Sequence, residues 1–266
     1  MSSQLADVIA GARAEGRAAL IAYLPVGYPD VDTSIAAMVA AVEGGADVVE
    51  VGVPYSDPGM DGPVIQEAVD VAVRAGVGMR DVLRAVAAVA EAGAVPVVMS
   101  YWNPIERYGV DRFADDLAAA GGAGAITPDL IPDEASAWLA ATERTGLDRV
   151  FLVAPSSTDA RLAATAAASR GFVYAASTMG VTGTRATVGD AAERLVARTR
   201  SVTGTAVCVG LGVSSGDQAA EVAAFADGVI VGSAYVRALL AGDGADGVRV
   251  LSQELASGVR RARVRA

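Results

Sequence analysis

The chain alternates short runs of apolar, often β-branched residues with longer Ala-rich segments in which apolar positions recur every three or four residues. The short runs predict buried strands, and the longer segments predict helices that pack one face on a sheet. The predicted strands lie at residues 20–26, 47–53, 95–101, 124–127, 149–154, 172–175, 206–210 and 228–231.

Each predicted strand is followed by helical sequence, and a further helix at 4–15 precedes the first strand. Eight strand-then-helix units in about 250 residues predict an α/β fold, a (β/α)₈ TIM barrel with an extra N-terminal helix. An open, doubly wound sheet is the alternative. No linker, low-complexity tract or break in composition divides the chain, so a single domain over 1–266 is expected. The predicted helices lie at 31–44, 63–75, 80–92, 110–120, 132–145, 158–169, 188–201, 214–224 and 233–241.

A weak internal repeat supports the barrel and singles out one residue. GADVVEVG at 45–52 resembles FADGVIVG at 225–232: in both copies a helix ends, an Asp starts a turn, and a buried strand ends in Gly. Glu50 in the first copy takes the position that Ile230 occupies in the second. A carboxylate inside an apolar strand costs several kcal/mol unless it is paired or protonated. This contrast indicates that Glu50 has a functional role.

A second acidic residue, Asp61, follows that strand in a loop punctuated by Pro and Gly. A strand carboxylate and a loop carboxylate just beyond the carboxyl end of the strand form an arrangement suited to acid–base chemistry. The structural alternatives are a buried carboxylate held by hydrogen bonds for Glu50 and an ordinary turn residue before Gly62 for Asp61.

The composition removes several kinds of catalysis. The chain has no His and no Lys, so all 21 cationic side chains are Arg, and it has one Cys. Without Lys no Schiff base forms on this chain, and without His neither a Ser-His-Asp triad nor a His-ligated metal site can be built. We therefore expect no metal site, and acid–base work falls to Asp, Glu or Tyr.

The remaining global features predict a soluble, cytoplasmic protein. At 266 residues and 53% hydrophobic composition the chain can bury a large core, while no apolar run reaches the length of a membrane span. The start of the sequence lacks the pattern of a signal peptide, and a single Cys fits a reducing compartment. A net charge of −10 argues against binding to nucleic acid or to anionic membranes. The basic run formed by Arg260, Arg261, Arg263 and Arg265 is interpreted as a solvated helix end.

The last three strand ends carry Gly-rich loops that are typical of a phosphate site. STMGVTGTR follows the sixth strand, GLGVSSGD the seventh and GSAYV the eighth, and Ser233 can begin a helix. Barrels commonly hold phosphate at the loops after strands seven and eight, although Gly also serves ordinary turns. Tyr23 and Tyr174, at the ends of strands one and six, are core or site residues. Cys208 is expected in the core, and Trp102 and Asn103 in a loop closed by Pro104.

The segment EVGVPYSDPGMDGPVIQ closely resembles the signature of the tryptophan synthase alpha subunit family. The flanking segments GADVVE, YWNPI, RYG, TPDLIPDE, GFVYAAS, GVTG and ADGVIVGSA occur in the order of the family, from about residue 20 to 240. The resemblance implies a (β/α)₈ barrel that cleaves indole-3-glycerol phosphate into indole and glyceraldehyde 3-phosphate. It also implies a pyridoxal-phosphate beta subunit as partner, expected as an α2β2 heterotetramer, with no cofactor on this chain.

The resemblance also assigns roles to residues. The two catalytic carboxylates of the family match Glu50 and Asp61. Tyr23 matches an aromatic position beside the indole, Tyr174 matches a site tyrosine, and Thr182 lies in the mobile loop of the family. The phosphate-binding positions match Gly183, Gly212, Gly232 and Ser233.

Some positions depart from the commoner family pattern and bear on ring packing and partner contact. Leu211 replaces an aromatic residue, Pro25 a Thr, Met60 an Ala, and Ile131 a Pro. Two alternatives stay open beside the two-subunit enzyme. One is a free-standing lyase that releases indole, and the other is an inactive homologue that acts only as an allosteric partner of the beta subunit.

The expected chemistry fits the residues that are missing. Cleavage of a carbon–carbon bond in the retro-aldol direction needs an electron sink, and without Lys or metal the sink must lie in the substrate. Protonation of the indole ring at C3 creates such a sink. Glu50 would deliver this proton and accept one from the side-chain hydroxyl, while Asp61 would stabilise the positive charge through the indole N–H.

Overall fold

The computed structural model describes residues 3–176, 190–210 and 212–262. All strand pairs in it are parallel, in the order β5-β4-β3-β2-β1-β9-β8-β7-β6. The strands are β1 (Ala19–Pro25), β2 (Val48–Gly52), β3 (Val95–Met99), β4 (Gly124–Ile126), β5 (Asp148–Val150), β6 (Leu152–Val153), β7 (Phe172–Ala176), β8 (Ala206–Gly210) and β9 (Gly228–Val231).

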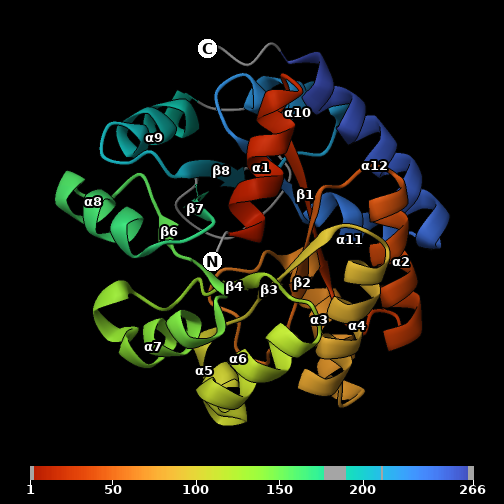
Figure 1. The fold of residues 1–266 in the computed structure, drawn as a ribbon. Helices are drawn as coiled ribbons and strands as arrows, with labels where there is room; N and C mark the ends of the chain where they lie inside the picture. Colours follow the sequence, from red (N-terminus) through yellow and green to blue (C-terminus); the bar gives the residue numbers. More distant parts are fainter. Residues whose placement is uncertain (1–2, 177–189, 211, 263–266) are drawn as a thin grey trace.

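The predicted fifth strand is divided in two. Strands β5 and β6 flank Phe151. The Phe151 carbonyl accepts a hydrogen bond from the Tyr174 N–H at 3.1 Å. Because β5 pairs with β4 and β6 pairs with β7, this interrupted strand closes the ring. The result is a (β/α)₈ barrel, which confirms the predicted fold class (Figure 1).

Helices surround the ring of strands, and α1 lies across one of its ends, as predicted for the extra N-terminal helix (Figure 1). The helices are α1 (Gln4–Ala14), α2 (Val31–Glu43), α3 (Pro63–Arg74), α4 (Met79–Glu91), α5 (Trp102–Tyr108), α6 (Val110–Ala119), the 3₁₀ turn η1 (Pro132–Glu134), α7 (Ser136–Thr145), α8 (Asp159–Ala168), α9 (Asp190–Arg200), α10 (Gly216–Ala223), α11 (Ser233–Leu240) and α12 (Gly244–Arg261).

Two helices correct the sequence prediction. The expected loop at Trp102 and Asn103 is helix α5, because Pro104 falls in the first turn, where its missing N–H costs no hydrogen bond. Helix α12 was predicted only as a helix end at the basic tail, since glycines at its start obscure its pattern. Arg260 and Arg261 end this helix, whereas Arg263 and Arg265 lie outside the described residues.

Two apolar layers hold the barrel together. Side chains from the strands fill its interior and meet Leu5 and Ile9 of α1, while a larger layer lies between the outer face of the strands and the helices. Cys208 is buried in the interior layer, as predicted. Helix α1 therefore closes the N-terminal mouth of the barrel and leaves the C-terminal mouth for a site. No helix among the described residues is long and apolar enough to cross a membrane.

Candidate active site

Glu50 occupies the middle of β2 and points into the barrel. Its backbone is in register with Tyr23 on β1 and Val97 on β3, and its side chain is only 2% exposed. Among the described residues, nothing hydrogen-bonds to Oε1 of this carboxyl group. Burial raises its pKa to about 8, so the group is protonated at neutral pH. The structural alternative, a carboxylate fully held by hydrogen bonds, does not account for this geometry.

Asp61 lies in the loop between β2 and α3 and is 7% exposed. The Tyr101 hydroxyl donates a hydrogen bond to Oδ1 at 3.3 Å, and the Gln66 side-chain amide donates to the Asp61 carbonyl at 2.7 Å. Burial raises the pKa of Asp61 to about 6, while the bond from Tyr101 opposes this rise. At neutral pH the two acids therefore differ: Glu50 carries a proton and Asp61 is ionised.

Tyr23 and Tyr174 line the same mouth of the barrel as the two acids. Burial and the nearby carboxylates raise the pKa of both phenols, so each stays neutral. Their rings lie beside the glycines that end β2 and β8 and the glycine that follows β9. A Cβ at Gly52 or Gly232 would come within 2.8 or 3.1 Å of the Tyr23 ring, and one at Gly210 would collide with the Tyr174 hydroxyl. The absence of a side chain at these glycines therefore leaves the space that the two tyrosine rings occupy.

The predicted phosphate positions that the structure describes lie after β8 and at the start of α11. Gly212 has φ +68°, a backbone conformation that favours glycine. Gly232 caps α11, and Ser233 is its first residue and is buried at 6% exposure. The Val236 N–H donates to the Gly232 carbonyl at 3.2 Å, and no described residue accepts a hydrogen bond from the three N–H groups before it, so the start of α11 can face an anion. Thr182, Gly183 and Leu211 lie outside the described residues.

The other positions at which this chain departs from the common family pattern lie around this mouth. Pro25 ends β1, Met60 precedes Asp61, and Ile131 is a large hydrophobic side chain with 39% exposure. Sequence reasoning missed Tyr101, which was placed in the third strand and given no role. Its contacts with Met60 and Asp61 join residues about forty positions apart, and no local pattern signals them. Within the described residues no three His, Cys, Asp or Glu side chains are grouped to hold a metal ion.

Comparison with known proteins identifies the family. The family model described as tryptophan synthase alpha chain matches residues 9–262. The tryptophan synthase alpha chain of Mycobacterium marinum is 64% identical over 259 residues, which cover 97% of this chain and 96% of that protein. This chain belongs to the tryptophan synthase alpha chain family.

Other relatives and solved structures agree with this assignment. The tryptophan synthase alpha chain of Thermobifida fusca is 62% identical over 261 residues, 96% of this chain and 97% of that protein. A structure of Mycobacterium tuberculosis tryptophan synthase matches with a TM-score of 0.94 and 63% identity, covering 98% of this chain and 99% of that chain. A tryptophan synthase alpha chain structure from Legionella pneumophila has a TM-score of 0.87 at 28% identity, covering 97% of this chain and 98% of that chain.

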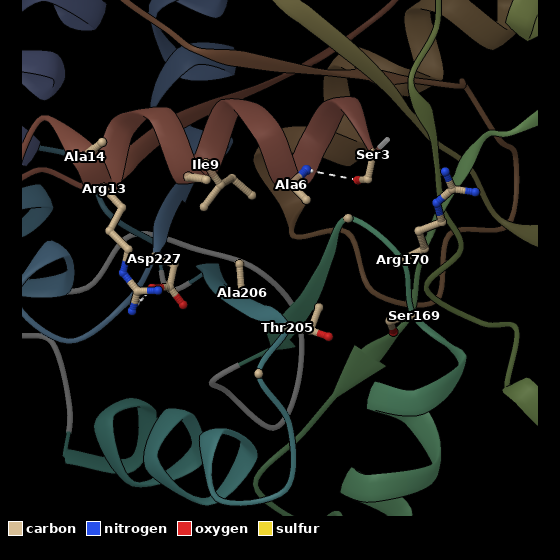
Figure 2. A pocket seen from close by; sticks show the side chains of 13 residues that line it. Ser3, Ala6, Ile9, Arg13, Ala14, Ser169, Arg170, Thr205, Ala206 and Asp227 are labelled. Atoms are coloured by element: carbon tan, nitrogen blue, oxygen red, sulfur yellow. Dashed lines mark hydrogen bonds and ion pairs between the residues drawn. The ribbon is translucent and has the colours of Figure 1, made fainter. Parts of the chain in front are cut away.

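A cavity lies away from these residues, at the N-terminal end of the barrel (Figure 2). It has a volume of about 640 Å³ and is lined by one face of α1 and by the segments that lead into β7 and β8. Arg13 and Asp227 meet beside it at 3.3 Å. None of the predicted site residues borders this cavity, so the candidate active site is confined to the opposite mouth.

Proposed function

We propose that Glu50 and Asp61 carry out the reaction of the tryptophan synthase alpha chain, the cleavage of indole-3-glycerol phosphate into indole and glyceraldehyde 3-phosphate. This carbon–carbon lyase step of tryptophan biosynthesis belongs to the chain by its family. The assignment of the two residues rests on one observation. Two buried carboxyl groups lie at the same mouth of the barrel, and no Arg among the described residues forms an ion pair with either of them. We treat residues 1–266 as one catalytic domain in the cytoplasm.

The pKa difference between the two acids sets their roles. Glu50, protonated at neutral pH, donates its proton to C3 of the indole ring, and the ring becomes an iminium ion. The ionised Asp61 accepts a hydrogen bond from the indole N–H and stabilises this positive charge.

The carbon–carbon bond at C3 then breaks, and its electron pair returns to the ring to restore indole. The hydroxyl of the departing carbon loses its proton to the Glu50 carboxylate as the aldehyde forms. Glu50 is protonated again at the end of the cycle, so the site needs no external acid or base.

The late loops orient the substrate for these steps. The N-terminal N–H groups of α11, with Gly212 and Gly232, would hold the phosphate, since backbone amides and the helix dipole favour an anion there. Thr182 and Gly183 are proposed to complete this site. Tyr23 and Tyr174 would flank the indole ring above the strand-end glycines.

A beta subunit that carries pyridoxal phosphate is the proposed partner, in an α2β2 complex. Support comes from the similarity to chains in tryptophan synthase structures and from the surface beside Asp61. On this surface Asp57 and Asn103 are exposed, and the Asn103 side chain donates a hydrogen bond to the Tyr55 hydroxyl at 3.0 Å. A partner seated there would receive indole and favour the active loop conformation.

Steady-state cleavage tests the reaction and the partner together. The chain alone should be a poor lyase, and added beta subunit should raise its rate at least tenfold, which needs about 1.4 kcal/mol of coupling. High basal activity with no response to the beta subunit would favour a free-standing lyase. Absence of cleavage with normal stimulation of the beta subunit would favour an inactive allosteric partner.

The role of Asp61 has its own test. A substrate analogue methylated at the indole nitrogen has no N–H to donate to the carboxylate. We expect it to be cleaved far more slowly than the natural substrate, and equal rates would remove Asp61 from the assigned role. Asp61→Asn should likewise cut turnover strongly, because the amide carries no charge to balance the ring.

A further inference from the structure

Tyr101 joins the loop that carries Asp61 to the segment that follows β3. Its hydroxyl accepts a hydrogen bond from the Met60 N–H at 2.9 Å and donates one to Asp61 Oδ1 at 3.3 Å. The side chain is 5% exposed, so water competes little for either bond. One buried hydroxyl thus holds two consecutive residues of the loop.

The pair of bonds gives the hydroxyl a fixed direction. A backbone N–H can only donate, so Met60 occupies a lone pair of the Tyr101 oxygen. The single hydroxyl proton is then available for Asp61, whose ionised form only accepts. On the other side of the loop, Gln66 fixes the Asp61 carbonyl at 2.7 Å. Asp61 is therefore held at its backbone from α3 and at its carboxyl group from Tyr101.

Further contacts keep the Tyr101 ring in place. It packs against the Tyr55 ring with centroids 5.4 Å apart, and Tyr55 in turn accepts a hydrogen bond from Asn103 at 3.0 Å. The loop after β2 and the start of α5 are thus connected at two points. A hydroxyl on so constrained a ring can set the position of the carboxylate that it contacts.

We propose that Tyr101 is the positioning residue for Asp61, holding the carboxylate where it meets the substrate and keeping it ionised. This role rests on the proposed function of Asp61. Among the described residues, the titratable groups that interact electrostatically with Asp61 are Tyr23 from β1, Tyr174 from β7 and Tyr101 itself. The hydrogen bond from Tyr101 lowers the pKa of Asp61 against the effect of burial, so its loss must raise that pKa.

The test is Tyr101→Phe in the full chain, alone and with the beta subunit. We expect kcat to fall about tenfold, KM to stay within about twofold, and the acidic limb of the pH–rate profile to move up by about one pH unit. Tyr108→Phe is the matched control, since the Tyr108 hydroxyl donates to Asp116 at 2.6 Å on the surface of the same region. The control should change none of these quantities.

Two further measurements separate positioning from mere structural support. In an Asp61→Asn background, Tyr101→Phe should lower kcat by less than about threefold, because Tyr101 acts through the carboxylate that this background lacks. An equal tenfold loss in that background, or an unmoved acidic limb, would overturn the proposal.

Carboxyl carbon NMR, with Asp61→Asn to identify the signal, should show a raised Asp61 pKa in Tyr101→Phe and none in Tyr108→Phe. An unchanged Asp61 pKa would also overturn the proposal. This readout needs no substrate, so it distinguishes failure of the positioning role from failure of the proposed reaction.

Discussion

The barrel buries carboxyl groups at both of its ends, and the two sets have opposite surroundings. At the N-terminal end, Asp47 accepts a hydrogen bond from the Leu20 N–H at 2.8 Å and pairs with Arg17 at 2.7 Å. At the C-terminal end, Glu50, three residues further along the same segment, has an Oε1 to which no described residue donates a hydrogen bond. Within four residues, the chain therefore pairs a half-buried acid just before β2 and leaves a buried acid inside β2 without a described hydrogen-bond partner at one oxygen.

The same pairing recurs at two other strand starts near the N-terminal end. Asp227 accepts a bond from the Val207 N–H at 2.8 Å and pairs with Arg200 at 3.0 Å and with Arg13, which Figure 2 shows beside it. Asp148 accepts bonds from Ser3 and Leu5 of the α1 segment and pairs with Arg170. These acids fix strand starts and tie α1 to the barrel.

The comparison separates two uses of a buried acid. An acid with a cation and a backbone donor holds neighbouring elements together but has no freedom to exchange its proton. An acid buried without such partners weakens the fold, and its raised pKa makes it useful for proton transfer near neutral pH. The barrel places the first kind at the end that α1 closes and the second kind at the end that is open.

The largest expected effect follows from removing the unpaired acid. Glu50→Gln should lower kcat by about 10²–10⁴-fold, because the proton donor is lost, while stability is unchanged or higher. The measurements are steady-state cleavage and thermal unfolding of the same preparations. Activity within threefold of wild type would show that Glu50 is not the proton donor, and its lack of a partner would then have no catalytic meaning.

A glycine comparison tests which end holds the phosphate. Gly232→Asp should weaken glycerol-phosphate binding at least tenfold, because a carboxylate would repel the anion and its Cβ would press on Tyr23. Gly204→Asp at the other end is the control, since a Cβ there meets nothing within 4 Å. Calorimetric titration that finds equal affinities in both variants would place the phosphate elsewhere.

Removing the charge of a paired acid should lower the stability of the fold and leave kcat nearly unchanged, which is the opposite of the result expected for Glu50→Gln. Asp227→Asn keeps an acceptor for the Val207 N–H but loses the charge that Arg13 and Arg200 face. We expect the free energy of unfolding to fall by about 1–3 kcal/mol, with kcat within about twofold of wild type. Asp32→Asn, which breaks an exposed pair with Arg84, should cost less than about 0.5 kcal/mol. Denaturant unfolding measures both, and equal losses would show that burial of the pair is unimportant.

The roles of residues at the C-terminal mouth of the barrel were easier to predict from the sequence than those at the N-terminal end, which α1 closes. Glu50 was predictable because a charge interrupts an apolar strand, and the repeat offered Ile230 for comparison. The repeat also aligns Asp47 with Asp227, yet their shared pairing with Arg and a backbone N–H was not predicted. Such contacts join residues distant in sequence, as does the bond from Tyr101 to Asp61, and local patterns do not encode them.

Element boundaries show the same limit. The strands at 206–210 and 228–231 occur with the predicted bounds, since compact apolar runs define them. The interruption at Phe151 and the start of α12 at Gly244 depend on packing against other elements. Periodicity alone therefore missed both.

The last expected effect is a dependence of stability on pH that comes from Glu50. Its pKa is about 8 in the folded protein, against an ordinary value of 4.5. Between these values the folded protein keeps a proton that the unfolded chain has released, so the free energy of unfolding falls as pH rises through this range. Below pH 4.5 both states are protonated at this position, and its stabilising contribution is complete.

Glu50→Gln removes this titration and leaves the paired acids of the other end in place. The stability of the variant relative to wild type should therefore increase from pH 5 to pH 8 by about 3–4 kcal/mol, because the wild-type group stays protonated in the folded state over most of this range and each pH unit then contributes about 1.4 kcal/mol. Thermal unfolding of both proteins at pH 5, 6.5 and 8 measures the difference. Asp61 titrates in the same direction, but it is present in both proteins and cancels. A constant difference between the two proteins across this range would mean that Glu50 is ionised throughout, and the contrast between the two ends would then concern geometry alone.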